Sequence, residues 1–485
     1  MSTRRLVSWL TFLAVFAMAA RVSVDSDTWW HLRAGQWMID HRAILQQDLF
    51  SYTRLGAPWE YPGWLVEIPM ALIFRVFGPG GLNLWAAAMV TLAFGLLWWA
   101  LTGGAFLKAF VTVLAAAASG IYWAARPYLV TFVLAAAFLL ILENEASKPP
   151  RAPGVWRRLG WLPLLMVVWA NSHGGFIVGF MLLGVYGFAA LTAWLLNPAR
   201  PRLRDSQAFQ LGIVGLAMIL AVCLNPAGPV MLLYPFKTVS IGALQQYIQE
   251  WQPPDFHSAQ VQPFIWLLLL TFGAVGASRQ RLRLSDFLLT AGFAYLSFMA
   301  ARNVALFALA APLALTRHAA PLTEALSRRL GLRPAFGGGT PQTRKLNWVI
   351  FGVLALVVAL KAAAVLPAEA SLVEMRKTLP VEAVNFLRSE RPAGRLFNSY
   401  NWGAYLMWEL PEYPVFIDGR TDLYDDELVD EWLRVIRAEA GWQEVLQRWE
   451  VRLALIEPGA PLARELEQAG WVELYRDERA VVYGR

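Results

Sequence analysis

The chain has 485 residues, 57% of them hydrophobic and only 16% charged, whereas soluble globular proteins carry about 25% charged residues. This composition excludes an ordinary soluble protein, and repeated apolar runs of nearly 20 residues indicate a polytopic α-helical membrane protein. The net charge of +7 comes from basic residues in short loops between these runs, which favours a role in membrane topology over nucleic-acid binding.

The first apolar run, residues 6–22, follows Arg4 and Arg5. No clear small-residue cleavage site precedes the charged stretch after it, so we interpret the run as a retained signal anchor. The single cysteine, Cys223, lies inside a later apolar run. No disulfide framework can therefore form within the chain.

Apolar runs recur along the first three quarters of the chain. Their predicted limits are 6–22, 64–78, 82–101, 109–122, 128–143, 161–172, 175–194, 209–224, 263–277, 283–300, 303–316 and 346–366. Basic residues gather between them in the segments 148–158, 200–204, 279–283 and 317–345. Because cytoplasmic loops carry an excess of Lys and Arg, we place these segments and the N-terminus in the cytoplasm.

This topology leaves residues 23–63 and 225–262 as large outer loops. It is self-consistent only if the run 64–78, which charged residues interrupt, is a short interfacial or re-entrant helix. About eleven crossings then remain. They place the N-terminus in the cytoplasm and the C-terminus outside.

The last quarter of the chain differs in character. Residues 319–345 contain Pro, Arg and a Gly-Gly-Gly run, which predicts a flexible cytoplasmic linker inside the membrane domain, 1–366. Residues 367–485 carry more charge, and β-like runs alternate with amphipathic helices. The predicted strands are RLFNSY, PVFID and VRLALIEP, the helices DELVDEWLRVIRAEA and PLARELEQAG, and the closing hairpin WVELYRDERAVVY. We expect a small soluble α/β domain on the outer face of the membrane.

Charged residues beside membrane segments are costly, which makes them candidates for function. Those predicted to face outward are Asp25, Asp27, His31, Arg33, Glu60, Arg126, His173, Glu250, Asp255, His257 and Arg302. Carboxylates and arginines together suit a phosphate-bearing, lipid-attached substrate, because arginine binds phosphate through paired hydrogen bonds. A carboxylate can also act as a general base or a metal ligand.

Structural roles stay open for several of these residues. Asp25 and Asp27 can cap the helix that follows them. His31 can pair within its helix, and Arg126, before Pro127, can satisfy carbonyl groups at a helix end. The tryptophans of the same stretch can anchor the chain at the lipid headgroups or stack on sugar rings. His173, in NSHGG, suits close helix packing as well as catalysis.

The outer loops contain two motifs, DTWWHLR at residues 27–33 and YIQEWQPPDF at residues 247–256, which resemble motifs of oligosaccharyltransferase catalytic subunits, members of the GT-C glycosyltransferase superfamily. DTWWHLR, residues 27–33, resembles the aspartate, aromatic pair and arginine of their first outer loop. YIQEWQPPDF, residues 247–256, resembles the glutamate motif of their long outer loop, with Glu250 in register.

Two later motifs extend this resemblance over most of the chain. MAARNVALFALAAPLAL, residues 299–315, is similar to the helix whose arginine binds the lipid-linked phosphate, and Arg302 takes that position. SYNWGAYLMWELPEYPVFIDGRTD, residues 399–422, resembles a degenerate WWDYG motif and the strand after it. Asn401 replaces its acidic residue, so recognition of a peptide sequon does not carry over.

The resemblance implies inverting transfer of a sugar from a polyprenyl-phosphate or -pyrophosphate donor, on the extracytoplasmic face of a prokaryotic cell membrane. The acceptor can be a protein, a lipid or a glycan. Asp27 is the expected catalytic base, with Asp25 as the alternative, and Glu250 positions the acceptor or a metal. Arg302, with Arg126 or Arg33, is expected to stabilise the departing phosphate. Further candidate substrate contacts are Trp29, Trp30, His31, Glu60, His173, Asn401 and Trp402.

The metal site of that family is the main departure. The family holds a metal with the first-loop aspartate, the long-loop glutamate and a second acidic motif, but no Asp or Glu occurs here from residue 68 to 142. Mg²⁺ or Mn²⁺ bound by Asp27 and Glu250, and catalysis without a metal, both remain open.

Two other functions remain as alternatives. The chain can be a catalytically degenerate scaffold that binds lipid-linked glycans, which the missing acidic motif favours. A transporter predicts internal repeats and charges near the membrane midplane. The sequence shows no repeat, and its charges lie at the ends of the apolar runs, so we rank the transporter last.

Overall fold

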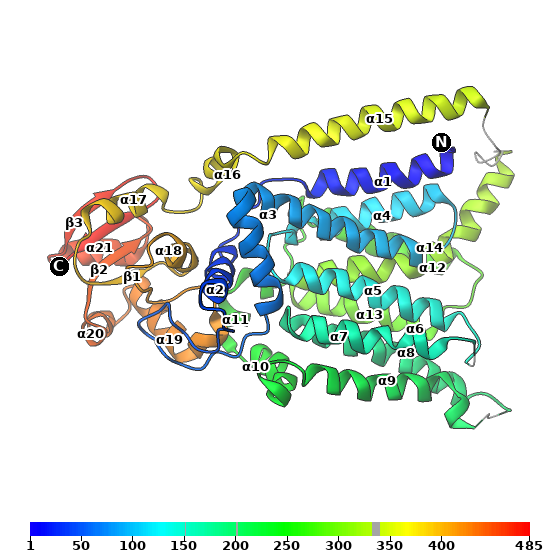
Figure 1. The fold of residues 1–485 in the computed structure, drawn as a ribbon, viewed down its shortest axis with the longest axis horizontal. Coiled ribbons are helices and arrows are strands. Elements are labelled where there is room, and N and C mark those ends of the chain that lie inside the picture. Colours follow the sequence, from blue (N-terminus) through cyan, green and yellow to red (C-terminus); the bar gives the residue numbers. More distant parts are fainter. Residues whose placement is uncertain (151, 200–201, 332–339) are drawn as a thin grey trace.

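The computed structural model describes residues 1–150, 152–199, 202–331 and 340–485. Helices from the first three quarters of the chain form a bundle, and a small α/β unit lies against one end of it (Figure 1). The N-terminus lies at the opposite end of the bundle from this unit (Figure 1).

The helices of the bundle and its connecting loops follow one another in chain order. They are α1 (Thr3–Ala19), α2 (Thr28–His41), α3 (Trp64–Ala100), α4 (Ala105–Ser119), α5 (Tyr128–Ala146), α6 (Val155–Leu159), α7 (Trp161–Ala170), α8 (Ile177–Leu195), α9 (Gln207–Val222), α10 (Tyr234–Val239), α11 (Gly242–Tyr247), α12 (Gln262–Ala277), α13 (Leu284–Met299), α14 (Val304–Arg329) and α15 (Pro341–Ala364).

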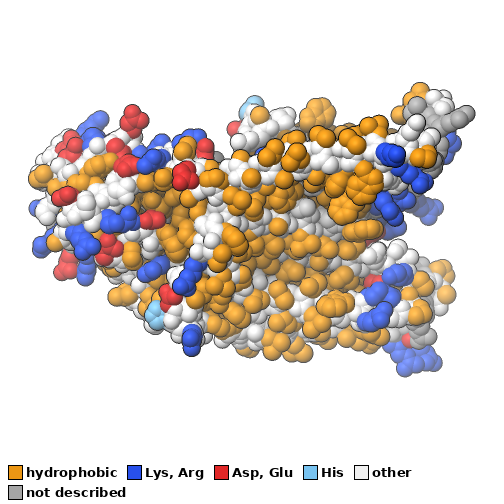
Figure 2. Space-filling model, turned by 45° about the horizontal axis from the view of Figure 1, so that its top comes forward, with side chains coloured by type: hydrophobic (Ala, Val, Ile, Leu, Met, Phe, Trp, Pro, Cys, Tyr) orange, Lys and Arg blue, Asp and Glu red, His pale blue; other side chains and the backbone are white. Residues whose placement is uncertain are grey.

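The bundle has the dimensions and surface of a membrane domain. Within the described residues, six helices are long and apolar enough to cross a membrane, namely α3, α4, α5, α8, α14 and α15, the turns next to α4, α8 and α14 included. The sides of the bundle are largely hydrophobic, and Lys and Arg side chains gather at the end opposite the α/β unit (Figure 2). The protein is therefore an integral membrane protein with a helical membrane domain.

Helix α3 is bent. Gly78 adopts a positive φ of 62° inside it, and Pro79 follows. Glycine reaches this conformation at little cost, and proline cannot continue the hydrogen-bond ladder of a helix. The part before the bend stands across the ends of the neighbouring helices, and the part after it runs along them (Figure 1).

The segment predicted as a flexible linker, 319–345, is largely helical where it is described. Helix α14 continues to Arg329, and α15 begins at Pro341, with the Thr340 hydroxyl accepting a hydrogen bond from the Thr343 amide. The Gly-Gly-Gly run of that segment lies in 332–339, outside the described residues, as do Arg151 and Arg200 of the basic loops.

The α/β unit is built from short elements. They are α16 (Ala368–Met375), α17 (Val381–Glu390), β1 (Arg395–Asn398), α18 (Gly403–Glu409), α19 (Thr421–Ile436), α20 (Trp442–Arg448), β2 (Val451–Ile456), α21 (Pro461–Gln468), β3 (Val472–Arg476) and β4 (Val481–Gly484). The sheet order is β1-β2-β4-β3, with β1 parallel to β2 and the other neighbours antiparallel. The expected closing hairpin is β3 and β4.

The predicted strand PVFID does not form a strand of this sheet. Val415 instead makes a single parallel bridge with Ser51 of the first outer loop. The Val415 amide donates to the Phe50 carbonyl at 3.1 Å, and the Phe416 amide donates to the Asn398 side chain at 2.8 Å. The sequence pattern was that of a strand, but the hydrogen-bond partners come from a distant loop and a side chain.

A buried ion cluster holds the first outer loop to the α/β unit. The Arg420 side chain is 0% exposed and donates to both carboxylate oxygens of Asp418, at 2.9 and 2.7 Å. Its third contact is Asp48 of the outer loop, also 0% exposed, at 2.7 Å. The guanidinium also lies over the Trp59 ring, 4.9 Å from its centroid. One arginine thus joins two segments that lie more than three hundred residues apart in the sequence.

We predict that Arg420→Met destabilises this junction by about 3–5 kcal/mol, because it leaves two buried carboxylates without a counter-charge. Arg54→Ala serves as the control, since the Asp425 carboxylate that Arg54 pairs with is 60% exposed, and such pairs contribute about 0–1 kcal/mol. Thermal unfolding and limited proteolysis of loop 42–63 measure the effect. Equal melting temperatures for the two variants would contradict the assigned role.

Candidate functional site

Arg126 is the centre of a charge cluster at the end of the bundle that faces the α/β unit. Its guanidinium lies 2.8 Å from Asp27, 3.4 Å from Asp25 and 3.5 Å from Glu250. A second arginine, Arg302, lies 3.9 Å from the other oxygen of Glu250. Three carboxylates and two guanidinium groups from four separate segments therefore meet at one place.

Local structure fixes the two aspartates. Asp27 is the N-cap residue of α2, and its own amide donates to the Asp25 carboxylate at 2.9 Å. The Asp27 side chain makes no capping hydrogen bond to α2. Its carboxylate faces Arg126 instead. Asp27 therefore does not cap α2 with its side chain, although the sequence had left that role open.

The long outer loop brings Glu250 to the cluster. Glu250 lies in a 3₁₀ turn, η5 (Gln249–Trp251), and Arg302 in a second one, η6 (Ala301–Asn303). The two turns are joined by a hydrogen bond from the Ala301 amide to the Gln252 carbonyl at 2.8 Å. The Arg302 guanidinium also lies 4.4 Å from the centroid of the Trp251 ring. These contacts bring the Glu250 and Arg302 motifs together at one place.

The surroundings shift the protonation of these groups in opposite directions. Burial, only partly opposed by Arg126, raises the pKa of Asp27 to about 7. Burial also disfavours ionisation of Glu250, but Arg126 and Arg302 outweigh it and lower the pKa of that carboxyl. Near neutral pH, Glu250 is therefore a permanent anion, whereas Asp27 exchanges a proton.

The charged groups of this cluster also act on His173. Its Nδ1 accepts from the Gly175 amide at 3.0 Å, and it lies 2.9 Å from the Thr131 hydroxyl, which in turn accepts from the Trp169 indole at 2.8 Å. Burial, together with Arg302 and Arg126, lowers the pKa of His173 to about 3. The imidazole is therefore neutral, and with Nδ1 accepting, its proton resides on Nε2.

The α/β unit closes on Asp27 through a glycine. A Cβ atom on Gly419 would lie 2.0 Å from the Asp27 Oδ1 atom, so only glycine leaves room for this carboxylate. Gly419 stands between the buried pair Asp418 and Arg420. In the sequence, Asp418-Gly419 is an ordinary turn signal, and such a signal gives no indication of the contact with Asp27.

The other predicted contact residues of the first outer loop lie outside the cluster. His31 is buried and bonds to Glu67 at 2.8 Å. Trp29 is packed edge-on against Tyr405 at 5.3 Å, and Trp30 against Trp59 at 5.5 Å. These tryptophans therefore pack in the interior, where they contact the α/β unit and the outer loop.

Two further predicted residues also face elsewhere. Arg33 is half-buried over the Phe50 ring, 5.6 Å from its centroid. Glu60 is exposed on the outer loop. Neither makes an ion pair with the cluster within the part of the chain that the structure describes.

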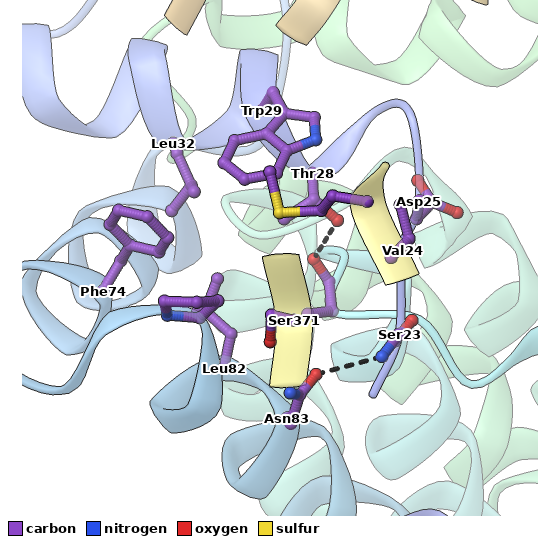
Figure 3. A pocket seen from close by; sticks show the side chains of 13 residues that line it. Ser23, Val24, Asp25, Thr28, Trp29, Leu32, Phe74, Leu82, Asn83 and Ser371 are labelled. Atoms are coloured by element: carbon purple, nitrogen blue, oxygen red, sulfur yellow. Dashed lines mark hydrogen bonds between the residues drawn. The ribbon is translucent and has the colours of Figure 1, made fainter. Parts of the chain in front are cut away.

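A small cavity lies beside Asp25, where the first outer loop meets the bend of α3 (Figure 3). Its walls are mostly apolar, and the Asp25 carboxylate lies at its edge, turned away from Leu32 and Phe74 (Figure 3). Its volume is about 20 Å³, which suffices for about one water molecule. This cavity is too small for a sugar, so a substrate must bind elsewhere.

The donor set does not fit a divalent cation. In the described ranges, no group of three or more His, Cys, Asp and Glu side chains is placed to hold a metal ion. Asp25, Asp27 and Glu250 converge, but the guanidinium of Arg126 lies among them. A metal bound there would meet this fixed positive charge at close range.

No protein-family model matches the chain, and no curated protein matches it by sequence. Solved structures do match it by fold. The archaeal oligosaccharyltransferase AglB from Archaeoglobus fulgidus, in complex with an inhibitory peptide and a dolichol-phosphate, superposes with a TM-score of 0.58 at 12% identity, over 96% of this chain and 70% of AglB.

A crystal structure of the Archaeoglobus fulgidus oligosaccharyltransferase tethered with an acceptor peptide gives a TM-score of 0.56 at 12% identity, over 93% of this chain and 69% of that one. Likeness at this identity establishes the fold alone. The resemblance to oligosaccharyltransferase catalytic subunits expected from the sequence is confirmed at the level of the fold.

Proposed function

We propose that the chain is a GT-C-type glycosyltransferase that moves a sugar from a polyprenyl-phosphate or -pyrophosphate donor to an acceptor at the extracytoplasmic membrane surface. The observation that carries this proposal is the convergence of Asp27, Arg126, Glu250 and Arg302 at the end of the bundle. A carboxylate with a pKa near 7 beside Arg126 suits a general base better than it suits a scaffold without chemistry.

In the proposed reaction, Asp27 accepts the proton of an acceptor hydroxyl or amide. The acceptor atom attacks the anomeric carbon as the bond from that carbon to the donor phosphate breaks, so the configuration inverts. The departing phosphate keeps the bonding electron pair, and Arg302 stabilises its charge. Arg126 and Glu250 hold Asp27 and Arg302 in position.

We propose eleven membrane crossings, with the N-terminus in the cytoplasm and the α/β unit outside. The crossing helices are α1, the part of α3 after Gly78, α4, α5, α7, α8, α9, α12, α13, α14 and α15. The basic end of the bundle then faces the cytoplasm (Figure 2). The part of α3 before the bend lies in the outer interface, because it stands across the helix ends (Figure 1).

Asp27→Asn is expected to lower sugar transfer by about 10²–10⁴-fold, the usual contribution of a general base. The test uses the purified full-length chain in lipid nanodiscs, polyprenyl-phosphate sugars as donors and a panel of protein, lipid and glycan acceptors. Asp40→Asn is the matched control. Asp40 lies on α2, the helix that follows Asp27, and the hydrogen bond described for its side chain comes from Gln36. Full turnover by Asp27→Asn would refute the assignment.

Stability provides a second prediction about Asp27. Its pKa is raised from 3.8 to about 7 in the folded protein, so the folded state binds this proton more tightly than the unfolded state does. Stability from this group is complete below about pH 4 and is lost as the pH rises through 7. At pH 8, Asp27→Asn should therefore melt no lower than the wild type. Between pH 8 and pH 5, the melting temperature of Asp27→Asn should fall relative to that of the wild type. A variant that melts below the wild type at pH 8 but not at pH 5 would contradict the raised pKa.

We also propose that the reaction needs no metal, since Arg126 supplies the positive charge among the three carboxylates. Addition of EDTA should then change turnover by less than about twofold, whereas removal of a catalytic metal abolishes its chemistry. Turnover before and after EDTA, and after added Mg²⁺ or Mn²⁺, measures this directly. A loss on chelation that either cation restores would show that Asp27 and Glu250 bind a metal.

A further inference from the structure

A second cavity, separate from the small one beside Asp25, opens between the first outer loop and the α/β unit. Its volume is about 280 Å³, just below the roughly 300–1,000 Å³ that ligand pockets span. Val24 and Ser26 form one wall, and Asn401, Trp402, Glu457 and Arg479 belong to the other. Ser26 stands between Asp25 and Asp27 in the chain, so this cavity adjoins the proposed catalytic loop.

The topology of the sheet explains why polar side chains gather here. Strands β1 and β2 are parallel, and the segment with Asn401 follows the carboxyl end of β1, as Glu457 follows that of β2. Strand β4 is antiparallel to β2, so Arg479, just before β4, comes to the same edge. In α/β folds, ligands bind in the crevice outside the carboxyl ends of parallel strands.

The side chains of this cavity have complementary chemistry. Glu457 is held by the Ser399 hydroxyl, which donates to it at 2.6 Å, and the Trp402 indole donates to the Thr378 carbonyl at 3.1 Å. Arg476 of the same hairpin pairs with Glu467 and Glu473. Arg479, by contrast, is in no ion pair with any of the described residues, and its guanidinium is available to a ligand.

We propose that this cavity binds the acceptor through a hydroxyl-bearing group that also carries an anion, a phosphate or a carboxylate. Arg479 binds the anion, because guanidinium groups match phosphate and carboxylate oxygens. Glu457 and Asn401 bind hydroxyl groups, while Trp402, Val24 and Leu379 offer apolar surface to the carbon skeleton. This inference rests on the proposed glycosyl transfer and names its acceptor class.

Tyr400 links this cavity to Asp27 by its place in the chain and by charge. This residue precedes Asn401, and its hydroxyl lies 2.5 Å from the Thr421 hydroxyl. Burial and the charge of Asp27 are the largest causes that hold the pKa of Tyr400 above its usual value. We therefore expect an acceptor anchored at Arg479 to extend towards Tyr400, with its reactive hydroxyl at the base.

The test measures binding separately from transfer, on the full-length chain in nanodiscs. Isothermal titration compares the binding of two soluble probes, glucose 6-phosphate and glucose. The lipid arm compares turnover in nanodiscs that contain phosphatidylglycerol with turnover in phosphatidylcholine nanodiscs. The variants are Arg479→Gln and Glu457→Gln, the latter keeping an oxygen that accepts from Ser399. Arg476→Gln, which removes the same charge from the same hairpin, is the control, and melting temperatures verify folding.

We expect the wild type to bind glucose 6-phosphate more tightly than glucose, or turnover to rise in phosphatidylglycerol. Arg479→Gln and Glu457→Gln should each weaken that response about tenfold or more, and Arg476→Gln should leave it unchanged. A wild type without preference for the anionic probes, or variants that keep it, would overturn the acceptor site. Hydrolysis of the sugar donor by water is measured in the same proteins. If the acceptor site is overturned but the proposed function is correct, this hydrolysis stays intact. Selective binding without any transfer or hydrolysis would instead refute the function and retain the site.

Discussion

The arrangement of this protein depends on one buried arginine. Arg420 is 1% exposed and joins Asp418 of the α/β unit to Asp48 of the first outer loop. A buried charge is tolerated only when its hydrogen-bonding groups are satisfied, and here the guanidinium has carboxylate partners and aromatic rings around it. Such a cluster has few alternative geometries, so it fixes the soluble unit relative to the membrane domain.

The position of the proposed catalytic loop follows from that junction. Gly419 stands between the two charged residues of the cluster and contacts the Asp27 carboxylate, which Arg126 contacts from its other side. The long outer loop is held in a similar way, because Asp426 accepts hydrogen bonds from the Gly242 and Ala243 amides at the start of α11. The Asp27 cluster and the proposed acceptor cavity thus both lie where these outer segments meet.

Buried charges at the opposite end of the bundle have another purpose. Arg317 of α14 pairs with Glu143 of α5 and Asp286 of α13, and the Tyr186 hydroxyl of α8 donates to Glu143 at 2.9 Å. These contacts join four helices and leave little net charge inside. The cluster near Asp27 differs, because its side chains are 17–31% exposed. Exposure distinguishes charges that are available to a substrate from charges that only hold helices together.

The sequence by itself determined the class of the protein, the strands β1 to β4, the amphipathic helices and the candidates Asp27, Glu250 and Arg302, because apolar length, periodicity and motif spacing are local properties. Only the tertiary structure decided which charged residues meet. Arg126 could have satisfied carbonyl groups, and Asp27 could have capped α2, since each local alternative is chemically sound. Likewise, His31, Trp29 and Trp30 carried a functional pattern but pack inside, and Gly419 looked like an ordinary turn. Long-range contacts choose among such alternatives, and no local pattern encodes the partner that a distant segment will provide.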